Sequence, residues 1–434
     1  MKILLVTDEI WNDRVNGNNV LQNWFEGMPG VEIAQIGCLP VKPFNIVCTR
    51  YFRLTDSQMV RSLFGRRAGE SFEISVEEMA ENPQTVNYIA QSRFYSTLKK
   101  ISGPALRIVR DIVWSVGRYN KQLLKQFIDD FKPDVVFCPR MLSWKMMRLE
   151  KQVAKLTDAP FIAFTADDEA SFRERNFSPL FWINRYFFHR AFKRHIPLYR
   201  HYYTFSEDQS REYREEYGVE TSELYKCGVF PEKFTPKPVG NPIRMVYAGK
   251  LYCNRWKSLA QIGLALREIN RDGVKIVLDI FTPDSLTDKQ RKVLSSNNYI
   301  YVKGRVSPEQ LVEEYKKADI ALHVESLDAR YRLATRISFS TKIIDLMASS
   351  CAILAIAWNQ HTGYKYLSSR DAAFCVSDYS QILPLLKEIT EHPEQITSYA
   401  EKAYRCGVNN HTRSAIQNQI LSEFQTIIDE KSSR

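Results

Sequence analysis

Short apolar runs recur along the chain and are separated by polar loops and longer amphipathic stretches. In the first half these runs are Lys2–Thr7, Val31–Ile36, Pro133–Cys138, Pro160–Thr165 and His201–Ser206. Runs of this length without polar alternation are typical of strands that are buried on both faces of a parallel sheet. The first half of the chain is therefore predicted to have an α/β fold.

The same alternation begins afresh in the second half. Predicted strands are Arg244–Tyr247, Lys275–Phe281, Tyr299–Val302, Ile320–Val324 and Ala352–Ile356, with predicted helices near Ser258–Asn270, Asp288–Ser295, Pro308–Lys317 and Thr341–Ser349 between them. Two further helices, about Ser380–Glu391 and Thr412–Glu430, are predicted to close the chain. The pattern predicts two Rossmann-like, doubly wound domains. Ligands of such a pair are expected at the carboxyl ends of the strands, in a cleft between the domains.

The boundaries between the predicted domains follow from breaks in this pattern. Cys227–Asn241 is rich in Pro and Gly and lacks a helical period, which predicts a linker. We expect residues 1–226 to form the first domain, 242–410 the second, and 411–434 a helix that returns to the first domain. Residues 42–130 interrupt the first domain and are expected to form a helical insertion. Its predicted helices lie near Val86–Lys100 and Leu106–Phe131.

Charge and cysteine usage narrow the range of partners. The 60 Lys and Arg residues exceed the 50 Asp and Glu residues, and the net charge of +10 favours anionic partners such as nucleotides, acidic membrane surfaces or nucleic acid. Nucleic acid is the weakest of these, because the basic residues are dispersed and no recognition motif is present. The eight cysteines form no C-x-x-C pair and are expected to be free thiols in a reducing compartment. The amino-terminal apolar run is too short for a signal peptide, and no run approaches the roughly 20 residues that span a bilayer. A cytoplasmic protein is expected.

Several familiar catalytic motifs are missing from the sequence. There is no G-x-G-x-x-G, no G-x-x-x-x-G-K-[ST] and no G-x-S-x-G, which argues against dinucleotide, P-loop and serine hydrolase chemistry. No His, Cys, Asp or Glu cluster has metal-ligand spacing. We therefore expect neither a bound metal ion nor another cofactor.

The stretch 318–357 carries the first candidate site, because it reads as strand, polar loop, helix and strand. Ser340, Thr341 and Lys342 stand directly ahead of the predicted apolar helix. A helix N-terminus has unpaired N–H groups and a partial positive charge, so it suits a phosphate group. Ser340 or Thr341 would cap the helix, and Asp345, one turn further on, would reach a sugar hydroxyl. An ordinary capped helix is the commoner explanation of such a pattern taken alone.

A second group of cations follows the first predicted strand of the second domain. Gly249 ends that strand, and Lys250, Arg255 and Lys257 follow before the next helix. A glycine allows the backbone to approach a ligand closely, and a diphosphate needs cations at short range. A solvated basic loop explains the same residues equally well.

Three other turns are expected at the same cleft. Gly304-Arg305-Val306 follows a predicted strand, and the backbone near Val306 could read the edge of a base, although a plain turn is at least as common. In the first domain, Asp167-Asp168-Glu169 would bring carboxylates to the strand ends. The loop around Gly17 is expected to close over the phosphates or to receive the acceptor.

The segment 179–203 is unusually aromatic and basic. On a single helix, Arg185, His189, Lys193 and Arg200 would share one face. Such a helix could lie on an anionic bilayer, and the contact would be made by residues 180–203. A core helix with a basic outer face is the more frequent reason for this pattern.

Taken in order, these motifs resemble those of the GT-B glycosyltransferases of the retaining, glycogen-synthase-like (group 1) family. The matching residues are Gly228-Val229 and Phe234-Thr235-Pro236 at the domain crossing, Gly249-Lys250-Leu251 with Arg255 or Lys257, and Ala318-Asp319, Asp345, Ala348 and Ala352–Ala355. Three features depart from the family pattern. Ile337 stands where the first acid of E-x7-E is expected, with Ser340-Thr341-Lys342 ahead of the helix. Ser350 replaces a glycine, and Asp167-Asp168 replaces His-Asp.

The resemblance implies transfer of a sugar from a UDP- or GDP-sugar to a hydroxyl of a saccharide or lipid-linked acceptor, with retention, in surface polysaccharide or glycoconjugate synthesis. Lys250 and Lys257 would stabilise the leaving diphosphate, Asp345 would bind the ribose, and Asp167 would act in catalysis. Three alternatives remain open at this point. They are a nucleotide-sugar epimerase or hydrolase of the same fold, a catalytically inactive GT-B partner subunit, and a nucleic-acid-binding protein.

Overall fold

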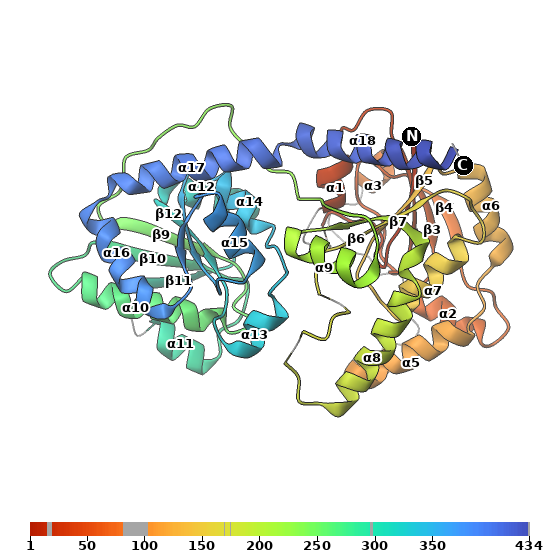
Figure 1. Cartoon of the computed structure of the whole chain (residues 1–434), viewed down its shortest axis with the longest axis horizontal. Helices are drawn as coiled ribbons and strands as arrows, with labels where there is room; N and C mark the ends of the chain where they lie inside the picture. Colours follow the sequence, from red (N-terminus) through yellow and green to blue (C-terminus); the bar gives the residue numbers. More distant parts are fainter. Residues whose placement is uncertain (15–19, 81–102, 169, 174, 296–297, 433–434) are drawn as a thin grey trace. The chain divides into compact units, whose positions relative to one another are not determined.

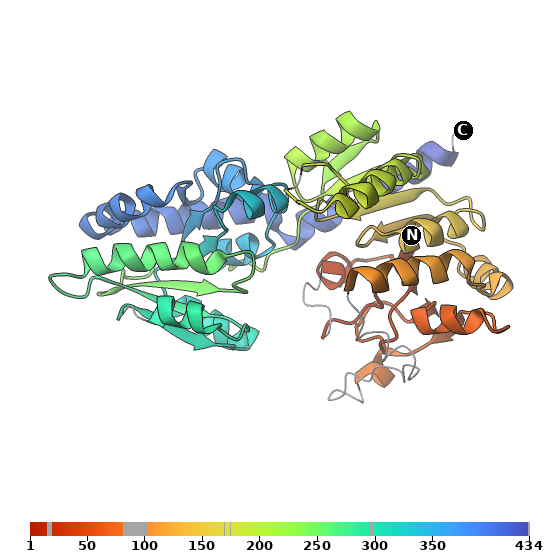
Figure 2. The same cartoon turned by 90° about the horizontal axis from the view of Figure 1, so that it is seen from below.

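The computed structural model describes residues 1–14, 20–80, 103–168, 170–173, 175–295 and 298–432. The chain divides into two compact units (Figures 1 and 2). Unit 1 consists of Met1–Ser171, Pro179–Leu224 and Ile416–Arg434, and unit 2 consists of Phe172–Ser178 and Tyr225–Ala415. Gly17, Glu169 and the predicted helix near residues 86–100 lie outside the described residues.

Unit 1 is built on an eight-stranded sheet. Its strands are β1 (Lys2–Val6), β2 (Glu32–Gly37), β3 (Arg50–Arg53), β4 (Glu70–Glu73), β5 (Val135–Pro139), β6 (Phe161–Thr165), β7 (Tyr199–Thr204) and β8 (Thr221–Glu223). The strand order is β4-β3-β2-β1-β5-β6-β7-β8, and every neighbouring pair is parallel except β3 and β4. The central strands are apolar throughout because helices cover both faces.

Alternate residues of each central strand pack against different helices of unit 1. Val136 of β5 belongs to a core cluster with residues of the helices between positions 103 and 217. The next residue, Phe137, lies on the opposite face, where its ring centroid is 5.9 Å from that of Trp24 and 5.3 Å from that of Phe424. The helices of unit 1 are α1 (Val20–Phe25), α2 (Asp56–Ser62), α3 (Val76–Ala80), α5 (Gly103–Val116), α6 (Lys121–Phe131), α7 (Trp144–Val153), α8 (Pro179–Lys193), α9 (Glu207–Tyr217) and, for its larger part, α18 (Arg413–Ser432).

The expectation of a helical insertion at residues 42–130 is wrong in part. β3 and β4 fall inside this range and extend the sheet beyond β2. With four residues each, RYFR and ESFE, these strands are too short and too polar to stand out as apolar runs. The helix predicted near Leu106–Phe131 is two helices, α5 and α6, because the side chain of Asn120 accepts a hydrogen bond from the Leu123 amide and starts α6 anew.

The segment 179–203 is also not one helix. α8 ends at Lys193, a short 3-10 turn follows at Ile196–Leu198, and Arg200 lies in β7. Pro197 has no amide hydrogen and restricts the residue before it, so the helix cannot continue through this point. Arg200 therefore does not share a helical face with Arg185. Within the part of the chain that the structure describes, no helix is both long enough and apolar enough to cross a membrane.

Unit 2 is built on a six-stranded parallel sheet. Its strands are β9 (Ile243–Ala248), β10 (Ile276–Phe281), β11 (Ile300–Gly304), β12 (Ile320–Val324), β13 (Ala352–Ile356) and β14 (Phe374–Val376), in the order β11-β10-β9-β12-β13-β14. Its helices are α10 (Arg255–Ile269), α11 (Asp288–Ser295), α12 (Pro308–Lys317), α13 (Ala329–Ala334), α14 (Lys342–Met347), α15 (Thr362–Ser369), α16 (Ile382–Glu391) and α17 (Glu394–His411), with a 3-10 turn at Tyr379–Gln381. Figure 1 shows α10 and α11 on one side of this sheet and α12, α14 and α17 on the other. The α/β class and the two parallel-sheet domains are as predicted.

Four elements of unit 2 have no counterpart in the predicted pattern, namely α13, α15, α17 and β14. The largest of them, α17, buries Ile396 and Tyr404 together with the small residues Ala400, Ala403 and Gly407. This helix packs against β13 and α14. β14 has three residues, too few for a visible strand pattern.

Candidate active site

The carboxyl ends of β9, β12 and β13 gather the candidate residues of unit 2. β9 pairs with β12, and β12 pairs with β13, all in parallel. The loop after β9 and the loop after β12 therefore leave the sheet at the same edge. The loop after β9 carries Gly249 and Lys250, and α10 begins with Arg255 and Lys257 in its first turn. The loop after β12 carries Glu325 and Asp328 and leads towards α14.

Lys342 and Gly249 meet at the centre of this edge. The ammonium group of Lys342 donates a hydrogen bond to the carbonyl oxygen of Ala248, over 3.2 Å. It occupies the space that a β-carbon on residue 249 would need. Any other residue at position 249 would thus displace the ammonium group, which gives a physical reason for a glycine at the end of β9.

The surroundings of Lys342 change its acidity. Dense packing of protein around the ammonium group lowers its pKa below the ordinary value of 10.5, and the positive charge of Arg255 acts in the same direction. The charges of Glu325 and Asp345 oppose this shift without cancelling it. Lys342 is therefore a cation held close to other cations, at a place where an anionic ligand would relieve the repulsion.

Arg255 is committed to a carboxylate in this structure. Its Nε and Nη2 atoms donate to the two carboxylate oxygens of Glu325, over 3.0 and 2.5 Å. The guanidinium also lies 4.5 Å from the ring centroid of Tyr252. Burial alone would raise the pKa of Glu325, but Arg255 first and the nearby histidines next leave that pKa lowered. Arg255 was predicted to bind the nucleotide sugar, and its geometry suits a fixed wall of the site.

Lys257 and Lys250 lie further out. The ammonium group of Lys257 is 2.7 Å from Oδ2 of Asp328, which also accepts a hydrogen bond from Asn254 over 2.7 Å. The Lys257 ammonium is the main reason that the pKa of Asp328 is lowered. The Lys250 side chain is exposed, and its backbone carbonyl accepts a hydrogen bond from Tyr247 over 2.7 Å. Both lysines can still turn towards a ligand, because neither is buried.

Two buried histidines, which the sequence patterns did not single out, stand behind these cations. His323 lies on β12 with 4% of its surface exposed, and its ring centroid is 5.9 Å from that of His361. Burial lowers the pKa of His323 to about 3, so the ring is neutral near pH 7. Its Nε2 atom has no hydrogen-bond partner among the described residues. In the sequence, the only sign of His323 is its position inside the apolar run IALHV. A histidine in such a run is more often a core residue than a ligand.

The start of α14 differs from the prediction. Thr341 adopts helical dihedral angles, φ −56° and ψ −22°, and no side-chain hydrogen bond caps the helix. The expected cap by Ser340 or Thr341 is therefore wrong, because an N-cap side chain needs an extended backbone to reach back to the amides. Ser340 and Thr341 are half-buried next to Lys342. Asp345 forms an ion pair with Lys226, over 2.7 Å, and half of its side chain stays exposed.

The turn at Gly304 and Val306 lies at the outer end of the same edge. Gly304 ends β11 with φ +78°, a conformation that suits glycine, and its carbonyl accepts a hydrogen bond from Thr282 over 2.9 Å. Val306 is half-buried in the loop before α12. β11 stands two strands from β9, which corresponds to about 10 Å across the sheet. That separation is within the reach of one extended nucleotide.

Unit 1 has its own carboxyl edge, with acids after β1 and β6. Asp8 follows β1 and accepts a hydrogen bond from the Met141 amide over 3.3 Å. Asp167 is exposed in the loop after β6. The neighbouring Asp168 accepts a hydrogen bond from the Ser171 amide over 3.1 Å and so braces this loop. Asp167 belongs to unit 1, whereas the cations described above belong to unit 2.

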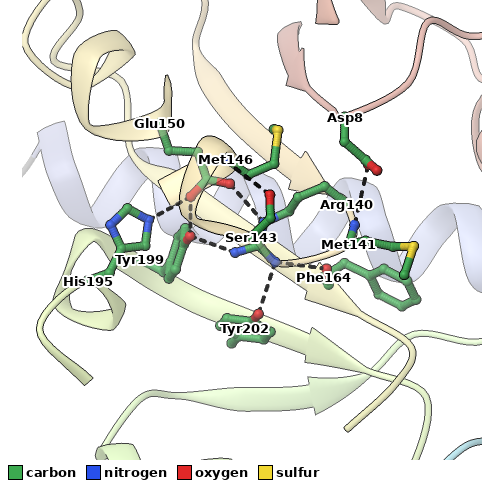
Figure 3. A network of polar contacts seen from close by, with 10 residues as sticks. All are labelled: Asp8, Arg140, Met141, Ser143, Met146, Glu150, Phe164, His195, Tyr199 and Tyr202. Carbon is green, nitrogen blue, oxygen red and sulfur yellow. Dashed lines mark hydrogen bonds and ion pairs between the residues drawn. The ribbon is translucent and has the colours of Figure 1, made fainter. Parts of the chain in front are cut away.

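A buried polar network fixes the connection from β5 to α7 in unit 1 (Figure 3). Arg140, directly after β5, pairs with Glu150 of α7 over 2.7 Å, and the side chains of both are fully buried. Arg140 also donates to the hydroxyls of Tyr199 and Tyr202, over 2.7 and 3.0 Å. The ring of His195 lies 2.6 Å from the second Glu150 oxygen. Every charge is thus paired, which is the condition for burying charges at tolerable cost.

We compared the chain with known protein families and solved structures. The family model described as "Glycosyl transferase-like" matches residues 265–422. A sucrose-phosphate synthase from Thermosynechococcus elongatus superposes with a TM-score of 0.61, at 12% identity, over 99% of this chain and 100% of that one. The trehalose-6-phosphate protein of E. coli bound with UDP-2-fluoro glucose has a TM-score of 0.62, at 10% identity, over 98% and 99%. This chain has a GT-B fold, and its residues 265–422 are similar to the glycosyl transferase-like family.

An α,α-trehalose-phosphate synthase (UDP-forming) from Burkholderia vietnamiensis is similar in the same way. Its TM-score is 0.59, at 11% identity, over 98% of this chain and 100% of that chain. At such identity the likeness concerns the GT-B fold. In sequence, the chain matches none of the curated proteins with which it was compared.

Some of the predicted residues of unit 2 lie close enough to interact electrostatically. The charges of Lys250, Arg255 and Asp345 all act on Lys342. Ile337, at the position of the missing first acid, is 1% exposed and belongs to the core rather than to the surface. No group of three potential metal ligands occurs within the residues that the structure describes.

Proposed function

We propose that this GT-B protein is a retaining, hexosyltransferase-type glycosyltransferase. It moves a sugar from a UDP- or GDP-sugar to a hydroxyl of a saccharide or lipid-linked acceptor, in the synthesis of a surface polysaccharide or glycoconjugate. The observation that carries the proposal is the Lys342 ammonium group, held beside the glycine at the end of β9 with further cations around it. The glycosyl transferase-like family match over residues 265–422 supports it.

The charges of unit 2 suit the chemistry of sugar transfer. Cleavage of the bond between sugar and diphosphate leaves positive charge on the sugar and negative charge on the departing phosphate. Lys342, Lys250 and Lys257 would stabilise the departing phosphate, and preorganised charge of this kind is usually the largest catalytic contribution. Under this proposal the lysines neutralise the diphosphate, and the reaction needs no metal ion.

The other predicted residues have supporting roles in the proposal. The half-exposed carboxylate of Asp345 would exchange part of its contact with Lys226 for the ribose hydroxyls. Ser340 and Thr341 would donate hydroxyl hydrogen bonds to the phosphates, and the backbone near Val306 would contact the base. Arg255, fixed by Glu325, would set the position of the β9 loop. Asp167 of unit 1 would act in catalysis.

Thermal unfolding with UDP, GDP and ADP, each at millimolar concentration, tests the proposal. A ligand that binds the folded state alone raises its stability by RT ln(1 + [L]/Kd), so a nucleotide at 100 times its Kd adds about 2.7 kcal/mol. We expect UDP or GDP to raise the melting temperature and Lys342→Ala to abolish most of the shift. Lys292→Ala on α11 serves as a matched surface control. Absence of stabilisation by all three nucleotides would contradict the proposal and favour an inactive GT-B partner subunit.

Product analysis separates transfer from the other reactions of the same fold. With a nucleotide sugar and no acceptor, a transferase should release little free sugar. Rapid release of free sugar, or formation of an epimeric nucleotide sugar, would instead indicate a hydrolase or an epimerase.

The proposed place of action is the cytoplasm, with peripheral contact to the inner face of the membrane. α8 carries Arg185 and Lys193 and leaves Leu180, Ile183 and Phe187 more than half exposed. A helix with cations and exposed apolar side chains is suited to an anionic bilayer surface.

A further inference from the structure

A groove of about 700 Å³ opens on the surface of unit 1 between α5, α7 and α8. Its lining is largely apolar, and it includes Ile112 and Trp114 from α5, Trp144 and Met147 from α7, and Ala191 from α8. The volume falls within the range of roughly 300–1,000 Å³ that is usual for small-molecule sites. The proposed sugar transfer uses none of these residues.

Exposed apolar side chains extend the groove along α8. Leu180 and Phe187 are 64% and 56% exposed. They share one helical stripe with the groove residues Asn184 and Ala191, because residues three, four and seven apart lie on the same face. On α5, Ile112 is 56% exposed at the opposite wall. The groove therefore continues as an elongated apolar strip, a shape that fits a chain better than a compact ring.

One wall of the groove is strongly basic. It is lined by Arg148 and Lys151, on the face of α7 that also carries Trp144, and by Lys155 in the turn after this helix. Among the described side chains, these three cations form no ion pair with a carboxylate. Asp111, an acid that also lines the groove, contacts Arg110 over 3.4 Å. An occupant with an apolar body and a negative charge would complement both features of this surface.

The amino-terminal end of α7 brings the groove to the carboxyl edge of the sheet. α7 follows β5 through the loop that contains Arg140 and Ser143. Lys145, in the first turn of α7, lines the groove and also acts electrostatically on Glu9, which follows β1. A molecule in the groove would therefore have one end beside the acids of this edge.

We propose that this groove binds the aliphatic chain of a phosphate-headed lipid, which is the lipid part of the acceptor, and that the α7 cations pair with its phosphate. This inference rests on the proposed function, since it names the class of acceptor for the sugar transfer. Charge complementarity favours a lipid phosphate over a neutral glycolipid, because Arg148 and Lys151 line the groove and pair with no carboxylate of the residues that the structure describes.

Alkyl phosphates of eight, ten and twelve carbons, each below its critical micelle concentration, test the proposal by calorimetric titration of the full-length protein. Each buried methylene contributes about 0.8 kcal/mol, so two more carbons should strengthen binding about tenfold. Dodecyl maltoside, with a neutral head, and inorganic phosphate, with no chain, should each bind at least tenfold more weakly than dodecyl phosphate. Equal binding by dodecyl maltoside, or a flat dependence on chain length, would overturn the proposal.

Two variants locate the binding in the groove. Ala191→Trp fills the groove and should abolish binding of dodecyl phosphate, whereas Ser369→Trp on the exposed surface of α15 should not. The pair Arg148→Ala and Lys151→Ala should weaken dodecyl phosphate at least tenfold and leave dodecyl maltoside unchanged. The pair Lys289→Ala and Lys292→Ala on α11 is the matched control. Unchanged binding by Ala191→Trp would overturn the assignment to this groove.

The thermal-shift experiment with UDP or GDP distinguishes failure of the groove proposal from failure of the proposed sugar transfer. Ala191→Trp lies in unit 1, so it should keep the thermal shift with UDP or GDP while losing transfer to a lipid phosphate. If nucleotides bind and sugar is transferred to a lipid-free saccharide, but alkyl phosphates do not bind, the groove proposal fails alone. If no nucleotide binds, the proposed function fails, and with it the role of the groove as an acceptor site.

Discussion

The Lys342 ammonium group occupies the volume that a side chain at Gly249 would fill. One residue ends a central strand and the other begins a helix 93 positions later, so the pair joins two motifs that are distant in sequence. The absence of a side chain at Gly249 therefore allows the Lys342 ammonium group to lie at the end of β9. This dependence makes Gly249 a sensitive test of the proposed diphosphate site.

Gly249→Ala should weaken UDP or GDP binding without removing any charge. The new methyl group would push the Lys342 ammonium away from the end of β9, and hydrogen bonds to charged groups contribute about 1.5–3 kcal/mol. The expected loss of affinity is roughly 10- to 150-fold, measured by calorimetry. Gly273→Ala is the matched control, since Gly273 also has a positive φ, +130°, but open space around it. Equal effects of both substitutions would indicate backbone strain rather than displacement of the lysine.

Binding of the nucleotide should fall off at high pH earlier than an ordinary lysine would cause. The pKa of Lys342 is lowered, mainly by dense packing, so the ammonium loses its proton below its usual range. Protonated lysine binds the diphosphate, and affinity should therefore decline as pH rises through this lowered pKa. In Lys342→Arg the guanidinium stays charged, and the decline should move to higher pH. Identical pH profiles of UDP binding in both proteins would contradict a role for this ammonium.

Lys250→Ala and Lys257→Ala should each lose most turnover while the fold persists. Lys250 lies in the loop after β9 and Lys257 in the first turn of the helix that follows this loop. Loss of one contact to a leaving phosphate costs about 10²–10³ in kcat. Initial rates with a nucleotide sugar and circular dichroism together measure the effect. Lys303→Ala, which removes a lysine from β11, is the control. Wild-type rates in both variants would disprove the assignment.

The stability of unit 2 should fall as the pH is lowered below about 6.5. Burial lowers the pKa of His323 to about 3 in the folded protein, whereas the unfolded chain takes up a proton near the ordinary value of 6.5. Between these values the unfolded state binds more protons, so unfolding becomes easier as the pH falls. The effect is on the order of a few kcal/mol at pH 4. In His323→Leu, urea unfolding should depend less on pH; an unchanged acid dependence would assign the effect to other groups.

The buried pair in unit 1 should be costly to break. Arg140→Met would leave the Glu150 carboxylate without its cation in a fully buried place. Removal of one partner of such a pair typically destabilises by about 3–5 kcal/mol. The double variant Arg140→Met with Glu150→Leu should be less destabilised than Arg140→Met alone. Urea denaturation measures both, and strictly additive losses would show that the two charges do not depend on each other.

Sequence alone predicted the parallel sheets because their central strands are long and apolar enough to be visible. It missed β3 and β4, which have four residues each and carry charged side chains, and it gave no prediction for α17. The chain order also puts Lys250, Arg255 and Lys257 together after one strand, and their role in a binding site stays a prediction. The hydrogen-bond partners could not be predicted. The pair of Arg255 with Glu325 and the pair of Lys257 with Asp328 each join loops 70 or more residues apart.

The last residues of the chain complete the core of the part that is synthesised first. Phe424 is fully buried against Phe137 of β5, and Gln417 donates to the carbonyl oxygens of Trp24 and Glu26 over 2.9 Å. Until these residues leave the ribosome, Phe137 is covered by Trp24 and Phe25 of α1 but lacks its contact with Phe424. The nascent protein must therefore keep an apolar surface soluble throughout synthesis of unit 2, and a chain truncated before Ile416 should aggregate rather than fold as a smaller, active protein.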